Sequence, residues 1–127
     1  MPENHLFEYA IIRIVPRVER EEFFNVGVVL FCKEKDFLEV KYVLDEEKLR
    51  FFCKELNTDE IAQYLSSFEK ICRGETEGGP IAKLDKASRF RWLTATRSTV
   101  LQTSKVHPGL CEDPHKALLR LYEQLVL

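Results

Sequence analysis

The sequence contains no long hydrophobic run and no leader-like N-terminus. Its longest apolar runs, such as Val26 to Cys32, are far shorter than the roughly 20 residues that a helix needs to cross a bilayer. Met1 to His5 is polar and has no basic region before an apolar stretch, so we expect no secretory signal. Cys32, Cys53 and Cys72 fall within apolar patterns that are typical of buried free thiols. Together these features predict a cytoplasmic protein with reduced cysteines.

Motifs that mark metal sites or catalysis are also missing. The chain has no CxxC or HExxH spacing and no glycine-rich phosphate loop followed by Lys and Ser or Thr. His107, Cys111 and His115 are spaced four apart and are zinc-ligand types, but a proline and a glycine would interrupt any helix that aligned them. Adjacency of a cysteine and a histidine does not by itself indicate a thiolate nucleophile. We therefore predict no metal, no cofactor and no catalytic residue, and an enzyme is the less favoured class.

Acidic residues are absent from one long segment. The 26 residues from Lys86 to Cys111 contain no Asp or Glu, but five Lys or Arg, seven Ser or Thr and the only Trp of the chain. This acid-free segment therefore has a net charge of +5. Since the whole chain has a net charge of −2, the remainder has a net charge of −7. That balance argues against a strongly basic nucleic-acid binder. A local anion site remains possible, since Arg forks and hydroxyl donors hold phosphate and carboxylate.

The length and hydropathy pattern predict one domain over residues 1–127. Strands are predicted at Leu6–Val15, Asn25–Lys33, Phe37–Leu44 and Thr99–Thr103. Helices are predicted to begin at Asp45 and after the capping residues Asn57, Asp85 and Asp113. Ser104 to Glu112 is predicted to be a loop. This order predicts an α+β fold, with a mostly antiparallel four-stranded sheet and helices packed on one face. The first two strands are apolar on both faces, so a second covering layer or a homodimer is also expected.

The candidate anion or ligand site lies in the second half of the acid-free segment. It comprises Arg97, Ser98, Gln102, Ser104 and His107, and Arg13 and Arg17 could add charge from the first connection. On a strand, Ser98, Gln102 and Ser104 would point the same way. The alternative is that the arginines form ion pairs with the acidic surfaces of the two middle helices. Trp92 beside Arg89 and Arg91 could stack on a nucleic-acid base, although packing in the core explains Trp92 better.

Three pieces of the chain resemble a known family. They are Tyr9–Pro16 (YAIIRIVP), Glu22–Phe31 (EFFNVGVVLF) and Phe90–Leu110 (FRWLTATRSTVLQTSKVHPGL), the last followed by Asp113 and Pro114. Together they resemble the bacterial domain-of-unknown-function family 3037, over nearly the whole chain. The resemblance carries no activity, cofactor or catalytic residue to positions in this sequence. It implies a bacterial cytoplasmic protein, encoded near kinase genes of the toxin–antitoxin type, with an accessory or partner-binding role.

The sequence thus favours a non-enzymatic interaction module whose basic segment faces an acidic or phosphorylated protein partner. One alternative is an enzyme or sensor that binds a phosphorylated small molecule or nucleotide. It requires Arg97, Gln102, Ser104 and His107 to line one pocket. A second alternative is nucleic-acid binding, which predicts affinity that falls steeply with salt. A homodimer remains an option, and we expect no membrane association.

Overall fold

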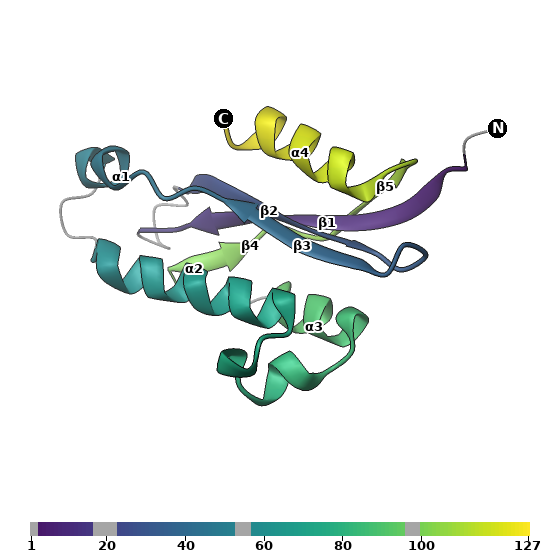
Figure 1. Ribbon diagram of the computed structural model, residues 1–127. Coiled ribbons are helices and arrows are strands. Elements are labelled where there is room, and N and C mark those ends of the chain that lie inside the picture. The colour runs from purple at the N-terminus through teal and green to yellow at the C-terminus, as the bar shows by residue number, and fades with distance from the viewer. Residues whose placement is uncertain (1–2, 17–22, 53–56, 96–99) are drawn as a thin grey trace.

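An antiparallel sheet between two helical layers forms the framework of the molecule (Figure 1). In this computed structural model, which describes residues 3–16, 23–52, 57–95 and 100–127, the sheet has five strands. The strands are β1 (His5–Ile14), β2 (Phe24–Cys32), β3 (Phe37–Tyr42), β4 (Leu101–Thr103) and β5 (His107–Cys111). The helices are α1 (Glu46–Phe52), α2 (Thr58–Arg73), α3 (Lys86–Leu93) and α4 (Pro114–Leu125), with short 3-10 turns η2 (Thr76–Gly78) and η3 (Pro80–Lys83) between α2 and α3. The predicted α+β class with an antiparallel sheet is confirmed.

The sheet is built around β1. One side of β1 pairs with β2, which in turn pairs with β3 through a tight hairpin. The other side pairs with β5 along the first half of β1 and with β4 along the second half. All of these pairs are antiparallel. The acid-free segment therefore supplies the strands on one edge of the sheet, as well as α3.

Three helix starts follow the capping residues that the sequence indicates. The side-chain oxygens of Asn57, Asp85 and Asp113 accept hydrogen bonds from backbone N–H groups in the first turns of α2, α3 and α4, at 3.1, 2.7 and 3.0 Å. Asp45 caps α1 in the same way, through the N–H of Lys48. Each cap satisfies a donor that the helix itself leaves open. Gly74 ends α2 with φ of 72°, a conformation that glycine adopts without strain.

The sheet is covered by helices on both faces, so the prediction that they pack on one face needs correction. The run from Val26 to Cys32 is entirely buried. One set of its side chains, including Val29 and Phe31, packs with α1, α2 and α3, while Val28, Leu30 and Cys32 pack with α4. A strand that is apolar on both faces needs two covers. Helix α4 is the second covering layer expected from that pattern.

The prediction of a loop from Ser104 to Glu112 is wrong for its second part, which forms β5. Pro108 and Gly109 suggested a loop, because both residues break regular structure. Proline is nevertheless tolerated in an edge strand, where its missing N–H costs no ladder bond. Gly109 pairs with Phe7, whose ring occupies the space that a Cβ at residue 109 would need. The glycine therefore marks close packing between neighbouring strands.

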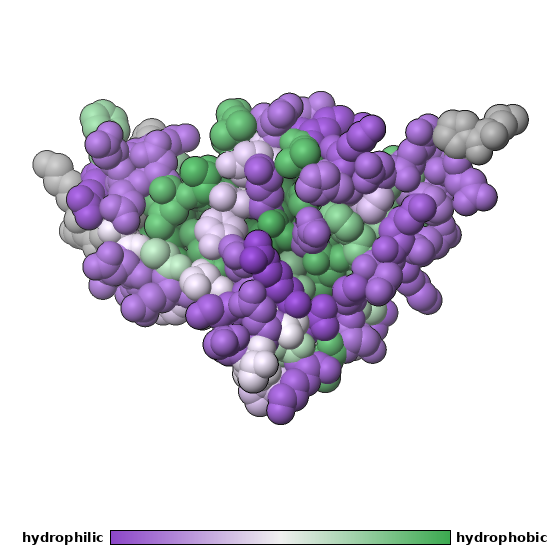
Figure 2. All heavy atoms as spheres, viewed as in Figure 1, coloured by the Kyte–Doolittle hydropathy of each residue, from purple (hydrophilic) through white to green (hydrophobic). Residues whose placement is uncertain are grey.

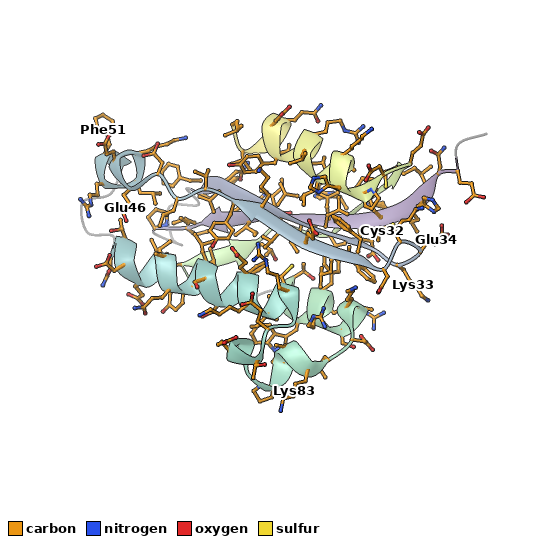
Figure 3. The ribbon with its side chains drawn as sticks, viewed as in Figure 1. Cys32, Lys33, Glu34, Glu46, Phe51 and Lys83 are labelled. Carbon is orange, nitrogen blue, oxygen red and sulfur yellow. The ribbon has the colours of Figure 1, made fainter. Side chains whose placement is uncertain are left out.

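Hydrophobic residues show between the helical layers, at the level of the sheet, whereas the outer sides of the helices are mainly hydrophilic (Figure 2). Phe51 is an exception, since its side chain is 84% exposed on α1 and points away from the molecule (Figure 3). In the described parts of the chain, no helix combines the length and the apolar character needed to cross a membrane.

Candidate functional site

Two cations at the start of the acid-free segment make contacts within the molecule. The Nζ atom of Lys86 lies 3.0 Å from a carboxylate oxygen of Asp36 and 2.7 Å from the backbone oxygen of the same residue, in the β2–β3 turn. Arg89 is 9% exposed, and its Nη1 donates to the carbonyl oxygen of Leu84 at 2.6 Å. The Arg89 guanidinium also packs against Gly74 at the carbonyl end of α2, where a positive charge is favourable. Lys86 and Arg89 thus hold the α3 region in place.

The predicted site residues are not gathered in one pocket by the described part of the structure. Arg97, Ser98 and Arg17 lie outside the described residues. His107 lies on β5 opposite Tyr9, with ring centroids 5.4 Å apart. Gln102 lies on β4, further along the same edge of the sheet, directly opposite Arg13.

Ser104 connects the two edge strands. Its backbone N–H donates to the carbonyl oxygen of Ile11 at 2.8 Å, and its Oγ accepts from the Ile11 N–H at 2.8 Å. The hydroxyl also donates to the Lys105 carbonyl at 2.9 Å. The Ser104 side chain therefore replaces a ladder bond to β1, in the break between the β4 and β5 ladders. It has a structural role in addition to any contact with a ligand.

The structure does bring Arg13 and Gln102 together, in a polar row that crosses the sheet. Arg13 on β1 lies opposite Asn25 of β2 on one side and opposite Gln102 of β4 on the other. Residues directly opposite each other in neighbouring strands point to the same face. That face is the α4 side, because Asn25 donates through Nδ2 to the carbonyl oxygen of Leu125 at 3.1 Å. We call Asn25, Arg13 and Gln102 the polar row.

The polar row contains two buried polar atoms without partners. Within the described residues, neither Arg13 Nε nor Asn25 Oδ1 makes a hydrogen bond, although both atoms are shielded from solvent. Arg13 forms no ion pair with a described carboxylate, and its Cζ lies 4.2 Å from the centre of the Phe23 ring. A buried donor left unsatisfied is costly, so such atoms call for an explanation. A bound group that both accepts and donates would satisfy them.

The placement of α4 leaves this part of the sheet accessible. Helix α4 packs on β2 and β3. On this face of β1, Phe7 is buried in the cluster with α4, whereas Tyr9, Ile11 and Arg13 further along the strand are only half-buried. The Arg13 end of β1 is also distorted by a bulge between Ile12 and Arg13. Bulges change the direction of side chains, and they are common next to functional sites.

A second feature is a groove on the opposite face of the sheet, between α2, the end of α3 and β4. Its volume is about 260 Å³. The groove is lined by Tyr64, Ser67, Phe68, Ile71, Trp92, Leu93, Ala95, Leu101, Gln102 and Thr103. Trp92 does not join the core as expected, because it is 37% exposed, whereas its neighbours Phe90 and Leu93 are buried. Trp92 and Tyr64 are the two exposed aromatic residues of the groove.

Two of the described thiols are kept protonated by burial, and two of the histidines lie beside carboxylates. Burial raises the pKa of Cys72 to about 12, and burial also raises the pKa of Cys111, so both thiols stay protonated near neutral pH. His115 lies 3.7 Å from a Glu39 carboxylate oxygen, and His5 pairs with Glu34. Glu34 lies in the β2–β3 turn (Figure 3). The described residues contain no group of three or more His, Cys, Asp or Glu side chains that could hold a metal ion.

Sequence reasoning missed Asn25, Phe23 and the groove. Arg13 was recognisable as a charged residue in an apolar strand, and Asn25 as a polar residue at the start of the next strand. Their pairing depends on the β1–β2 register, which the bulge shifts by one residue. The groove joins elements far apart in the chain, and no local pattern indicates such contacts.

Comparisons with known proteins give one match. Residues 9–126 match the model of a family described as protein of unknown function (DUF3037). No curated protein and no solved structure matches the chain significantly. The family match covers nearly the whole chain.

Proposed function

The chain belongs to the DUF3037 family of proteins of unknown function, and we propose that it is a non-enzymatic interaction module. Its polar row binds an acidic or phosphorylated segment of a protein partner. A bacterial cytoplasmic setting fits this role. A kinase of the toxin–antitoxin type, encoded nearby, is one candidate partner.

Arg13 is the observation that carries this proposal. Its guanidinium is half-buried, makes no ion pair with a described carboxylate and has a buried Nε without a partner. Carboxylate and phosphate oxygens match the geometry of a guanidinium edge and form its strongest hydrogen bonds. The Phe23 ring packs against the guanidinium and restricts its orientation.

An enzyme or sensor for a phosphorylated small molecule receives less support. Of its four required residues, Ser104 is bonded to the backbone of β1, the His107 ring lies against the Tyr9 ring, and Gln102 lies opposite Arg13. These three side chains do not line one cavity among the described pockets. A binding role that uses Arg13 therefore fits the geometry better.

A peptide array tests the proposal without knowledge of the partner. Each dodecapeptide with Glu or phosphoserine is matched by a version with Gln or serine, and binding is measured for three forms of the protein. Wild type should retain the acidic or phosphorylated version of a pair. Arg13→Gln should lose about tenfold or more of this preference, since hydrogen bonds to charged groups contribute about 1.5–3 kcal/mol.

Arg73→Gln is the matched control. Arg73 is exposed on α2 and pairs with Glu69, four residues earlier in the same helix. This variant should bind like wild type, and circular dichroism should show that both variants are folded. The proposal fails if wild type shows no preference for charged peptides, or if the two variants lose it equally.

A further inference from the structure

We infer that the groove between α2, α3 and β4 holds a large apolar side chain from the same acidic partner segment. The inference rests on the proposed function, because it assumes that the partner is acidic. It adds a second contact and a requirement on the partner sequence. An acidic segment without an apolar anchor should bind weakly.

The groove has the size and lining of an anchor site. Its floor includes the buried side chains of Phe68, Ile71 and Leu93, while the rings of Trp92 and Tyr64 remain exposed. A volume of about 260 Å³ lies just below the range of pockets for small ligands. Interfaces draw most of their affinity from a few large side chains in such pockets.

The cations that are nearest in sequence to the groove lining favour an acidic partner. Six of the ten lining residues belong to the acid-free segment, so this wall of the groove has no carboxylate. Arg91 precedes Trp92, and Lys105 follows Thr103 by two residues. Both cations are exposed, and neither forms an ion pair with a described residue. On the α2 side, the carboxylate of Glu60 is already engaged within the molecule, because it accepts a hydrogen bond from the Tyr64 hydroxyl at 2.5 Å.

The groove and the polar row lie on opposite faces of the sheet, on the two sides of β4. Gln102 lines the groove and also lies opposite Arg13 in the sheet. Its neighbours Leu101 and Thr103 line the same groove. Because β4 is an edge strand, one partner segment that passes around this edge would reach both features, with an acidic group at Arg13 on one face and an apolar side chain in the groove on the other.

The test uses defined peptides and the single tryptophan of the chain. The probes are Glu-rich dodecapeptides that carry Leu, Ala or Lys at one central position. Because Trp92 is the only Trp, its fluorescence reports directly on the groove. The Leu peptide should bind about tenfold or more tightly than the Ala and Lys peptides. Its binding should also shift the Trp92 emission to shorter wavelength.

Ser67→Phe fills the groove and Gln63→Phe is its control. Both residues are exposed on α2, but only Ser67 lines the groove. Ser67→Phe should remove the preference for Leu while acidic peptides still bind, and Gln63→Phe should keep it. Circular dichroism of both variants shows whether they are folded. If Ser67→Phe is not folded, the Leu, Ala and Lys comparison in wild type decides alone.

The outcomes separate this inference from the proposed function. Equal binding of Leu and Ala peptides would overturn the groove inference, while charge-dependent binding lost in Arg13→Gln would still support the polar row. Binding of the Leu peptide that does not require its Glu residues would overturn both. If sedimentation shows a dimer that Ser67→Phe disrupts, the groove belongs to an interface between two copies, and the inference is also wrong.

Discussion

Ser104 shows at the residue scale how one hydroxyl can complete a strand edge. The β4 and β5 ladders on β1 are separated by a short break, and the Ser104 hydroxyl accepts the Ile11 N–H within it. An alanine would leave this N–H without its acceptor in a part of the chain where Ser104 is 6% exposed. An unsatisfied buried donor costs about 1–3 kcal/mol.

We therefore expect Ser104→Ala to lower the free energy of unfolding by about 1–3 kcal/mol in urea denaturation. Ser67→Ala, at an exposed site on α2, should change it by less than about 0.5 kcal/mol. Equal stability of wild type and Ser104→Ala would show that the hydroxyl does not hold the edge together.

Tyr42 gives a prediction for alkaline pH. Burial, assisted by the hydrogen bond to Glu69 and its charge, raises the pKa of Tyr42 from 10.0 to about 12. The folded state therefore keeps the proton more tightly than the unfolded state. The stabilisation is fully present below about pH 10 and is lost as the pH rises towards about 12.

Urea denaturation at several pH values above 9 measures this effect. The free energy of unfolding of wild type should fall more steeply with pH than that of Tyr42→Phe, which has no phenol to titrate. Parallel pH profiles for the two proteins would contradict the assignment.

The residue scale also shows what sequence reasoning can reach. The capping roles of Asn57, Asp85 and Asp113 were predictable, because a cap acts within three residues. The role of Ser104 was not, since its partner Ile11 is 93 residues away. A hydroxyl in an acid-free segment gives the same local signal whether it binds a ligand or a backbone N–H.

At the scale of elements, α4 is the cover for one face of the sheet. Leu118 of α4 is 2% exposed and packs in the cluster that contains Cys32 of β2, which is fully buried. Cys32 lies beneath this helix (Figure 3). Loss of a large buried side chain leaves a cavity and weakens the contact between helix and sheet.

Leu118→Ala should lower the free energy of unfolding by about 2–5 kcal/mol. It should also speed the reaction of Cys32 with a thiol reagent, as measured by mass spectrometry of labelled peptides. Leu119→Ala on the same helix is the control, because Leu119 is only half-buried and should have a smaller effect. Unchanged labelling of Cys32 in Leu118→Ala would argue that α4 does not protect this face.

Elements differ in how far the sequence predicts them. The first three strands follow from period-two patterns, and α2 and α4 follow from period-3.6 stripes between clear caps. β5 was missed because Pro108 and Gly109 locally resemble a loop, and only pairing with Phe7 explains the glycine. The position of α4 could not be predicted in the same way. The pattern of β2 shows that both faces of the strand are covered, but it does not indicate which helix covers which face.

At the scale of the whole molecule, the charge asymmetry is distributed rather than concentrated. The acid-free segment contributes α3 on one face of the sheet and the β4 and β5 strands at its edge. Lys86 and Arg89 stabilise the α3 region, while Arg91 and Lys105 stay exposed. The absence of acidic residues from this segment is visible in the sequence. It could not show that the polar row is completed by Arg13 and Asn25 from other strands.

The most direct test of the proposed function follows the Arg13 side chain itself. Nuclear magnetic resonance detects arginine Nε–H groups individually, and Arg13→Gln identifies the Arg13 signal by its loss. Addition of a phosphoserine or Glu-rich dodecapeptide should shift this signal and slow its exchange with water, because the Nε–H gains an acceptor. The matched Ser or Gln peptide should have no such effect. An Arg13 Nε–H signal that stays unchanged at saturating charged peptide, or responds equally to the neutral peptide, would contradict the account.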